Sequence, residues 1–202
     1  MLNSRTDSSY RMSLFIELLY GLAIGNGLSD AIKTTVLENN LILYFFLTIG
    51  IISGIGEWLA YHIYVSPISY RGVKRILIDI TIPLIIYAII IAPTLAKNIN
   101  VYHYTSFLCL IYFSLARYYV RALRLDDHPI PDGIIIILNS CLFLVGFGVT
   151  FEIIITFYLE KMFPHSSFLN KFEVIGSIFG MLAFFFWTIF NLRNASIALS
   201  DQ

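Results

Sequence analysis

The chain has 202 residues, of which 58% are hydrophobic and only 13% are charged, and its mean hydropathy is +0.79. Soluble domains carry about 25% charged residues, so this composition excludes an ordinary soluble protein and favours an integral membrane protein. The formal net charge is zero, which leaves no basic surface for nucleic acid and excludes it as a partner.

Six apolar runs follow one another along the chain, each long enough to cross the ~30 Å hydrocarbon core of a bilayer as a helix. They lie at residues 12–36, 41–65, 73–96, 103–124, 133–159 and 172–195. The connections between these runs are short, and no soluble domain fits into them. We therefore predict an all-α integral membrane protein, with one six-helix transmembrane channel-like domain at 12–197 and short cytoplasmic tails at 1–11 and 198–202.

The first predicted span carries a stripe of residues that share one helix face, because their spacing follows about 3.6 residues per turn. The stripe consists of Arg11, Phe15, Leu18, Leu22, Asn26, Ser29 and Lys33. Gly21 and Gly25 run beside it, at the spacing that lets helix backbones approach closely in lipid. Polar groups at Asn26 and Ser29 gain nothing from lipid, so we interpret the stripe as facing a water- or ion-filled space. The alternative is that Asn26 and Ser29 only form hydrogen bonds between packed helices.

Several ionisable residues lie inside the predicted spans, where such groups are costly and usually face the interior of a helix bundle. Glu17 lies on the opposite side of the first span from the stripe. We expect it to hydrogen-bond to the second or third span, and a role in proton relay is the alternative. Asp79 follows Arg75 by four residues, which predicts an ion pair on one helix face. Glu152 has no partner nearby in the sequence, so it is the first candidate for a group that titrates, and Asp79 is the second.

The basic residues are distributed unevenly between the two ends of the predicted spans, and cytoplasmic connections are known to carry the excess of Lys and Arg. Nine of the 13 lie on the side that holds both termini: Arg5, Arg11, Arg71, Lys74, Arg75, Arg117, Arg121, Arg124 and Arg193. The remaining four are lysines and lie on the other side. We therefore predict a multi-pass protein of the cell membrane with both termini in the cytoplasm.

The sequence contains no catalytic motif: HExxH, GxSxG and a glycine-rich phosphate loop are all missing from it. Its two cysteines, Cys109 and Cys141, lie inside apolar runs and give no metal-binding spacing. We therefore expect no enzyme activity, no cofactor and no metal site.

Three motifs stand in the first half of the chain. The first predicted span opens with Arg11-x-x-x-Phe15 and has an acid at Glu17, the second closes with Trp58-Leu59-Ala60-Tyr61-His62, and the third closes with Pro93-Thr94. These motifs resemble those of the transmembrane protein 175 family of potassium channels. The run Glu17-Leu18-Leu19-Tyr20 is also faintly similar to the low-temperature-requirement A membrane proteins, which we rank second.

The resemblance implies a homotetramer in which the first helix of each subunit lines a central pore for potassium or other monovalent cations. The rings that line the family's pore fall on Leu22, Asn26 and Ser29, with Leu18 one turn before them, and Leu22 would form a hydrophobic gate. The resemblance also implies a structural network that braces the first helix, formed by Arg11, Phe15, Glu17, Trp58 and His62.

Three hypotheses for the function follow. The leading one is a potassium-permeable channel whose pore is lined by the first helix of each subunit. The first alternative is a proton-coupled small transporter that uses Glu17, Glu152 and His62. The second alternative is an accessory subunit of a larger membrane complex that transports nothing itself. All three place the chain in contact with membrane lipid.

Overall fold

The computed structural model of the protein describes residues 2–35, 41–62, 73–95, 100–125, 132–162 and 169–200. Regular structure in these ranges is helical throughout, without a strand, which confirms the predicted all-α class. The chain divides into two compact units, Met1–Ile91 with Thr188–Gln202 and Ala92–Trp187. Each unit buries its own set of apolar side chains.

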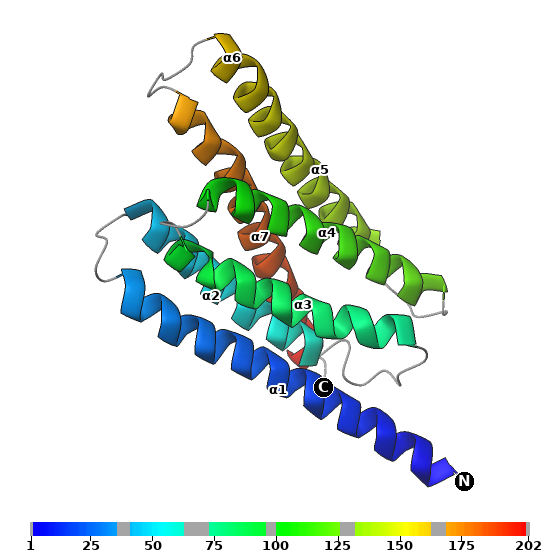
Figure 1. Ribbon diagram of the computed structural model, residues 1–202. Coiled ribbons are helices and arrows are strands. Elements are labelled where there is room, and N and C mark those ends of the chain that lie inside the picture. Colours follow the sequence, from blue (N-terminus) through cyan, green and yellow to red (C-terminus); the bar gives the residue numbers. More distant parts are fainter. Residues whose placement is uncertain are drawn as a thin grey trace. The chain divides into compact units, whose positions relative to one another are not determined.

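The helices agree closely with the predicted runs (Figure 1). In chain order they are α1 (Leu2–Thr35), α2 (Leu41–Ala60), α3 (Val73–Ile91), α4 (Val101–Leu125), α5 (Asp132–Ile154), α6 (Glu160–Met162) and α7 (Leu169–Ser200). A 3-10 turn at Ala92–Leu95 follows α3, and a π-helical segment at Ile155–Leu159 joins α5 to α6. The first helix begins at Leu2, so residues that we assigned to an N-terminal tail belong to α1.

Four stretches of the described chain are long and apolar enough to cross a membrane: Arg11–Asp30, Leu41–Leu59, Asp132–Tyr158 and Val174–Asn194. These four stretches indicate a membrane protein. The third and fourth predicted spans form α3 and α4 but do not belong to this set. The first turns of α3 carry Lys74, Arg75 and Asp79, and α4 mixes Tyr, His, Thr and Ser with its apolar residues and carries arginines towards its end.

In the first unit, α1, α2 and α3 pack alongside one another (Figure 1). The buried residues of α1 recur every three or four positions and so form one helix face. They are Ser13, Ile16, Tyr20, Ala23 and Gly27. Gly27 lies so close to α3 that an added Cβ would be 2.8 Å from Ile90 Cγ2. This close contact fixes the rotation of α1, with its other face exposed.

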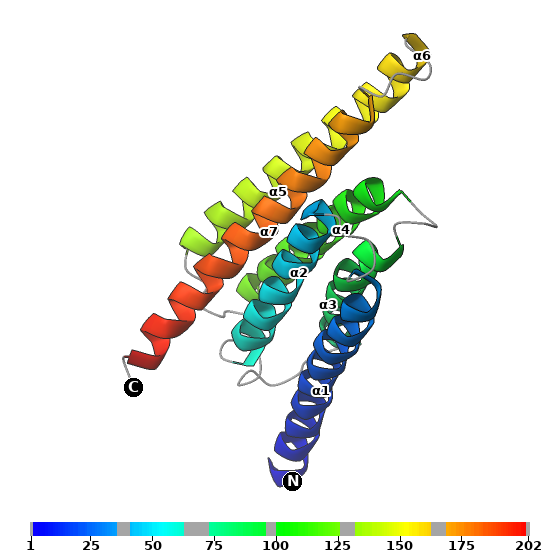
Figure 2. The same cartoon turned by 90° about the vertical axis from the view of Figure 1, so that its left-hand side faces the viewer.

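The second unit consists mainly of α4, α5 and the first part of α7, and Figure 2 shows α5 and α7 side by side. In its core, the ring centroids of Tyr112 and Phe184 lie 4.3 Å apart, and Trp187 Nε1 donates a hydrogen bond to the Tyr112 hydroxyl at 2.9 Å. The buried face of α5 consists of Leu138, Cys141, Val145, Gly148 and Glu152. Glu152 is therefore the charged end of an otherwise apolar stripe.

Candidate functional site

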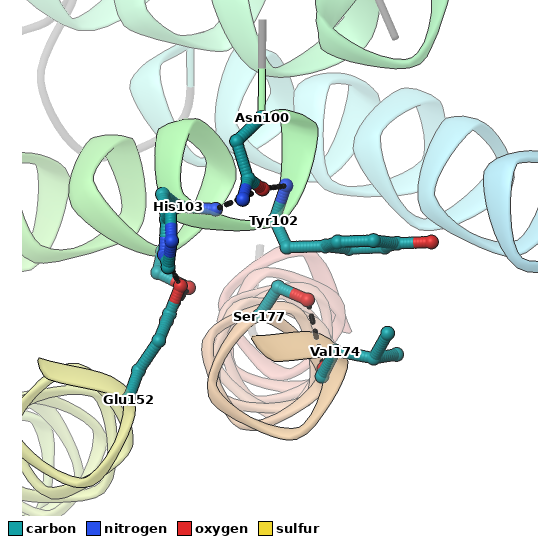
Figure 3. A network of polar contacts seen from close by, with 7 residues as sticks. Asn100, Tyr102, His103, Glu152, Val174 and Ser177 are labelled. Atoms are coloured by element: carbon teal, nitrogen blue, oxygen red, sulfur yellow. Dashed lines mark hydrogen bonds and ion pairs between the residues drawn. The ribbon is translucent and has the colours of Figure 1, made fainter. Parts of the chain in front are cut away.

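The carboxyl group of Glu152 is enclosed in the second unit, where this residue is only 2% exposed. Two side chains of α4 contact it: His103 Nδ1 meets Glu152 Oε1, and Ser106 Oγ donates a hydrogen bond to Glu152 Oε2 at 2.8 Å. Figure 3 shows His103 and Glu152 pointing toward each other from different helices. The acid without a partner nearby in the sequence thus has partners 46 and 49 residues earlier in the chain.

The contact between His103 and Glu152 joins two groups that can each bind a proton. Either the ring nitrogen donates to the carboxylate, or the carboxylic acid donates to the ring nitrogen. The His103 side chain is 39% exposed and that of Glu152 only 3%. The half-exposed His103 side chain therefore lies between the buried carboxyl group and the surface of the unit.

The start of α4 holds His103 in position. Asn100 caps this helix, because its Oδ1 accepts hydrogen bonds from the Tyr102 N–H at 3.1 Å and the His103 N–H at 3.3 Å (Figure 3). The Asn100 carbonyl accepts a further bond from the Tyr104 N–H at 3.1 Å. Asparagine is favoured at this position since its side chain satisfies N–H groups that have no acceptor within the helix.

Replacing Asn100 with Ala is expected to destabilise the protein by about 1 kcal/mol, because two N–H groups at the start of α4 lose their acceptor. Asn100→Asp keeps an acceptor oxygen and should unfold close to the wild-type temperature. Thermal unfolding in detergent compares the two variants. If Asn100→Ala were as stable as wild type, the side chain of Asn100 would not be what fixes the start of α4.

Glycines on α5 and α7 make room for the Glu152 carboxyl group. A Cβ added to Gly176 would collide with Glu152 Oε2 and would lie 3.0 Å from the Gly148 carbonyl oxygen. A Cβ added to Gly148 would lie 3.1 Å from the Gly176 carbonyl oxygen. The two helices therefore approach through these glycines, and the carboxyl group occupies the space where a side chain at 176 would stand.

A pocket of about 750 Å³ opens beside this cluster. His103 and Ser106 of α4 line it together with Glu152 of α5 and Thr156 of the π-helical segment. Thr156 Oγ1 is buried and has no hydrogen-bond partner within the described part of the chain. The lining of the pocket therefore includes the residue that carries the buried carboxyl group, Glu152.

No protein-family model, curated protein or solved structure matches this chain. The similarity to the transmembrane protein 175 family therefore stays a prediction from motifs. The function has to be inferred from the chemistry of the residues that the fold brings together.

The first unit holds a second contact between a carboxylate and a histidine. His62, in the π-helical turn after α2, lies with Nδ1 3.1 Å from Glu17 Oε1. The expected hydrogen bond from Glu17 to the second predicted span is thus present. The rings of Trp58 and His62 lie 6.5 Å apart, and Asn191 donates to Glu57 Oε1 at 3.2 Å. The Glu17 side chain is 20% exposed, so this pair is less enclosed than the pair at Glu152.

The predicted ion pair on the third span is confirmed. Arg75 Nε lies 3.9 Å from Asp79 Oδ2 across one turn of α3, and both residues are buried. Asp79 thus has a neighbour that keeps its positive charge at all accessible pH values. Glu152 faces an imidazole instead, and the titrating role expected first of Glu152 and second of Asp79 stays a prediction.

The stripe on α1 lies on the exposed face of the first unit, opposite the face that packs on α3. Every one of its residues is exposed within the chain: Arg11, Phe15, Leu18, Leu22, Asn26, Ser29 and Lys33. An added Cβ at Gly21 or Gly25 would have nothing within 4 Å. The polar end of α1 is therefore not enclosed within the first unit, and the pore-lining role of Leu18, Leu22, Asn26 and Ser29 stays a prediction.

Sequence reasoning did not single out His103 and Ser106 as site residues. A signal for them exists in the antiparallel pairing of α4 and α5, since residues equally far from a helix–helix connection lie at similar levels. His103 precedes the end of α4 at Leu125 by 22 residues, and Glu152 follows the start of α5 at Asp132 by 20 residues. This spacing does not predict how each helix is rotated about its own axis, because side-chain packing determines that rotation.

Proposed function

We propose that the protein is a proton-coupled transporter of monovalent cations in a cell membrane, in which Glu152 binds either a proton or the transported cation. The observation that supports this most is the burial of Glu152 beside His103 in the wall of a pocket. Ionisable groups at membrane depth that pair with one another are typical of proton relays and ion pathways.

The coupling follows from the cost of burying charge. An ionised carboxylate that is removed from water loses several kcal/mol of solvation unless a partner neutralises it. At Glu152 the neutralising partner is a proton shared with His103 or a cation in the pocket. Since one carboxylate needs only one of these, each excludes the other, and the movement of cations becomes linked to the movement of protons.

We further propose that α3 and α4 also cross the membrane, which gives six spans with both termini in the cytoplasm. At 1.5 Å per residue, the 19 residues of α3 extend about 28 Å and the 25 residues of α4 about 38 Å. These lengths suit a ~30 Å hydrocarbon core. The basic start of α3 and the basic end of α4 then lie at the cytoplasmic surface, where an excess of Lys and Arg is expected.

Liposomes loaded with a pH-sensitive dye test the proposed transport. The purified full chain is reconstituted, and outward gradients of potassium, sodium and small organic cations are imposed in turn with the membrane potential clamped. We expect at least one gradient to acidify the lumen, because a cation that leaves is exchanged for an entering proton. If no cation moves protons faster than in protein-free liposomes, the proposal is wrong.

The exposed stripe on α1 favours a second candidate, a potassium-permeable channel. Asn26 and Ser29 are exposed on a face that also carries Gly21 and Gly25, which suits contact with other copies of α1. In a homotetramer this face would surround a pore, with Leu22 as its hydrophobic constriction. A constriction of this kind closes by excluding water.

Replacing Leu22 with Asn is expected to raise potassium flux into liposomes several-fold if α1 lines a pore, because polar side chains hydrate the constriction. Leu14→Asn is the matched control, since Leu14 is exposed on α1 but lies off the stripe. Flux through a pore should not depend on a pH gradient. Equal flux in the wild type and both variants would remove the channel hypothesis.

A further inference from the structure

The pocket beside Glu152 is larger than a bare alkali ion needs. Its volume of about 750 Å³ lies within the range of about 300–1,000 Å³ that is typical of pockets for small organic molecules. Hard cations prefer about six or more oxygen ligands. Among the lining residues of the described chain, side-chain oxygens come only from Glu152, Ser106 and Thr156. This wall therefore offers a poor site for a dehydrated metal cation.

The remaining wall is mostly apolar and includes two aromatic rings. Phe107 of α4 is 58% exposed, and Phe157 of the π-helical segment is 71% exposed. Both line the pocket together with Ile153. Aromatic rings attract cations through their faces, most strongly where the cation is removed from water. The wall thus combines apolar surface for the body of a ligand with two aromatic rings that can attract a positive charge.

The charged groups around the pocket favour a cation over an anion. His103 and Lys161 are the titratable lining residues besides Glu152 in the described chain, and from α7 the glycine Gly176 approaches the carboxyl group. Lys161 is exposed in α6, beyond the π-helical segment, where its ammonium group stays hydrated. An anion in the pocket would approach the Glu152 carboxylate, whereas a cation replaces the proton there.

We propose that this pocket binds a small organic cation, an ammonium group carried on an aromatic or alkyl body, with its charge between Glu152 and the rings of Phe107 and Phe157 and its body against the apolar wall. The inference rests on the proposed transport function, because it names the substrate class of the same carboxylate.

Three probes that share a benzene ring and differ in charge test the charge preference: benzyltrimethylammonium, benzyl alcohol and benzoate. Binding of each to the full chain in detergent is measured by equilibrium dialysis. We expect benzyltrimethylammonium to bind about tenfold or more tightly than benzyl alcohol, and benzoate to bind least. If benzoate bound more tightly than benzyltrimethylammonium, the pocket would be an anion site near Lys161 and the proposal would be overturned. Equal binding of all three probes, or binding of none, would also overturn the proposal.

Two variants locate the site. Glu152→Gln should bind benzyltrimethylammonium no better than benzyl alcohol, because the carboxylate is lost while the shape is kept. Phe157→Leu should weaken the binding of benzyltrimethylammonium roughly threefold to tenfold and leave the binding of benzyl alcohol nearly unchanged. Phe157 is exposed, so this variant stays informative even if Glu152→Gln does not fold. Phe143→Leu is the matched control, since Phe143 is an exposed ring of α5 that does not line the pocket. Weakening by Phe143→Leu as large as by Phe157→Leu would overturn the assignment.

The outcomes separate this inference from the proposed function. If benzyltrimethylammonium binds through Glu152 and no cation gradient moves protons in liposomes, the organic-cation site stands and the transport function fails. If potassium or sodium gradients move protons through Glu152 while benzyltrimethylammonium neither binds nor competes, the transport function stands and the substrate class is wrong.

Discussion

Glu152→Gln is expected to reduce cation–proton exchange in liposomes to the rate of protein-free vesicles. Glutamine keeps the size of the side chain and an oxygen that accepts the hydrogen bond from Ser106 Oγ, which Glu152 Oε2 accepts at 2.8 Å. It cannot take up or release a proton, so the competition between proton and cation at this position disappears. The measurement is the initial rate of luminal acidification under an outward cation gradient.

Glu57→Gln is the matched control for this experiment. Glu57 is also a buried acid, at 9% exposed, but Asn191 contacts it at 3.2 Å with an amide instead of an imidazole. A glutamine at 57 can still accept that hydrogen bond, so exchange should continue near the wild-type rate. If cation–proton exchange continued in Glu152→Gln but stopped in Glu57→Gln, the proton-binding site would lie in the first unit.

Gly176→Ala is expected to destabilise the protein by about 1–3 kcal/mol, the usual cost of overfilling a packed interior. The new Cβ would collide with Glu152 Oε2. It would also lie 3.0 Å from the Gly148 carbonyl oxygen and 3.1 Å from Glu152 Cβ. The carboxyl group cannot move aside freely, because His103 and Ser106 hold it. Thermal unfolding in detergent measures the loss, and cation–proton exchange should fall with it.

Gly146→Ala provides the comparison within α5. An added Cβ at Gly146 has no described atom within 4 Å, and alanine favours a helix over glycine by roughly 0.5–1 kcal/mol. This variant should therefore match or exceed the wild-type unfolding temperature. If Gly146→Ala and Gly176→Ala changed the unfolding temperature equally, the close approach of α5 and α7 at Glu152 would not be real.

The helices and the local contacts are the part of this structure that the sequence predicted well. The length of each apolar run predicts where a helix lies, and the four-residue spacing of Arg75 and Asp79 predicts their ion pair. Both predictions depend only on residues that are close together in the chain. A hydrogen bond between Glu17 and the second or third predicted span was expected, since Glu17 lies on the face of α1 opposite the exposed stripe. The structure forms this contact with His62. In each case helical geometry alone limits where the side chain can point.

The site around Glu152 depends on packing that no local pattern encodes. His103 lies at the start of α4, and its meeting with Glu152 requires both the register of two antiparallel helices and the rotation of each. The close approach at Gly148 and Gly176 sets part of that rotation. The six-span count, which the sequence predicted from run length, stays a prediction, since four stretches of the described chain are the clear candidates for spans.

The central claim is that the buried carboxyl group of Glu152 loses its proton when a cation binds. Infrared difference spectroscopy on the reconstituted full chain, recorded as the most effective cation of the liposome assay is added, observes this step directly. A carboxylic-acid band should disappear as a carboxylate band grows, and both changes should be missing in Glu152→Gln. An unchanged carboxylic-acid band in the wild type, or the same band changes in Glu152→Gln, would contradict this claim.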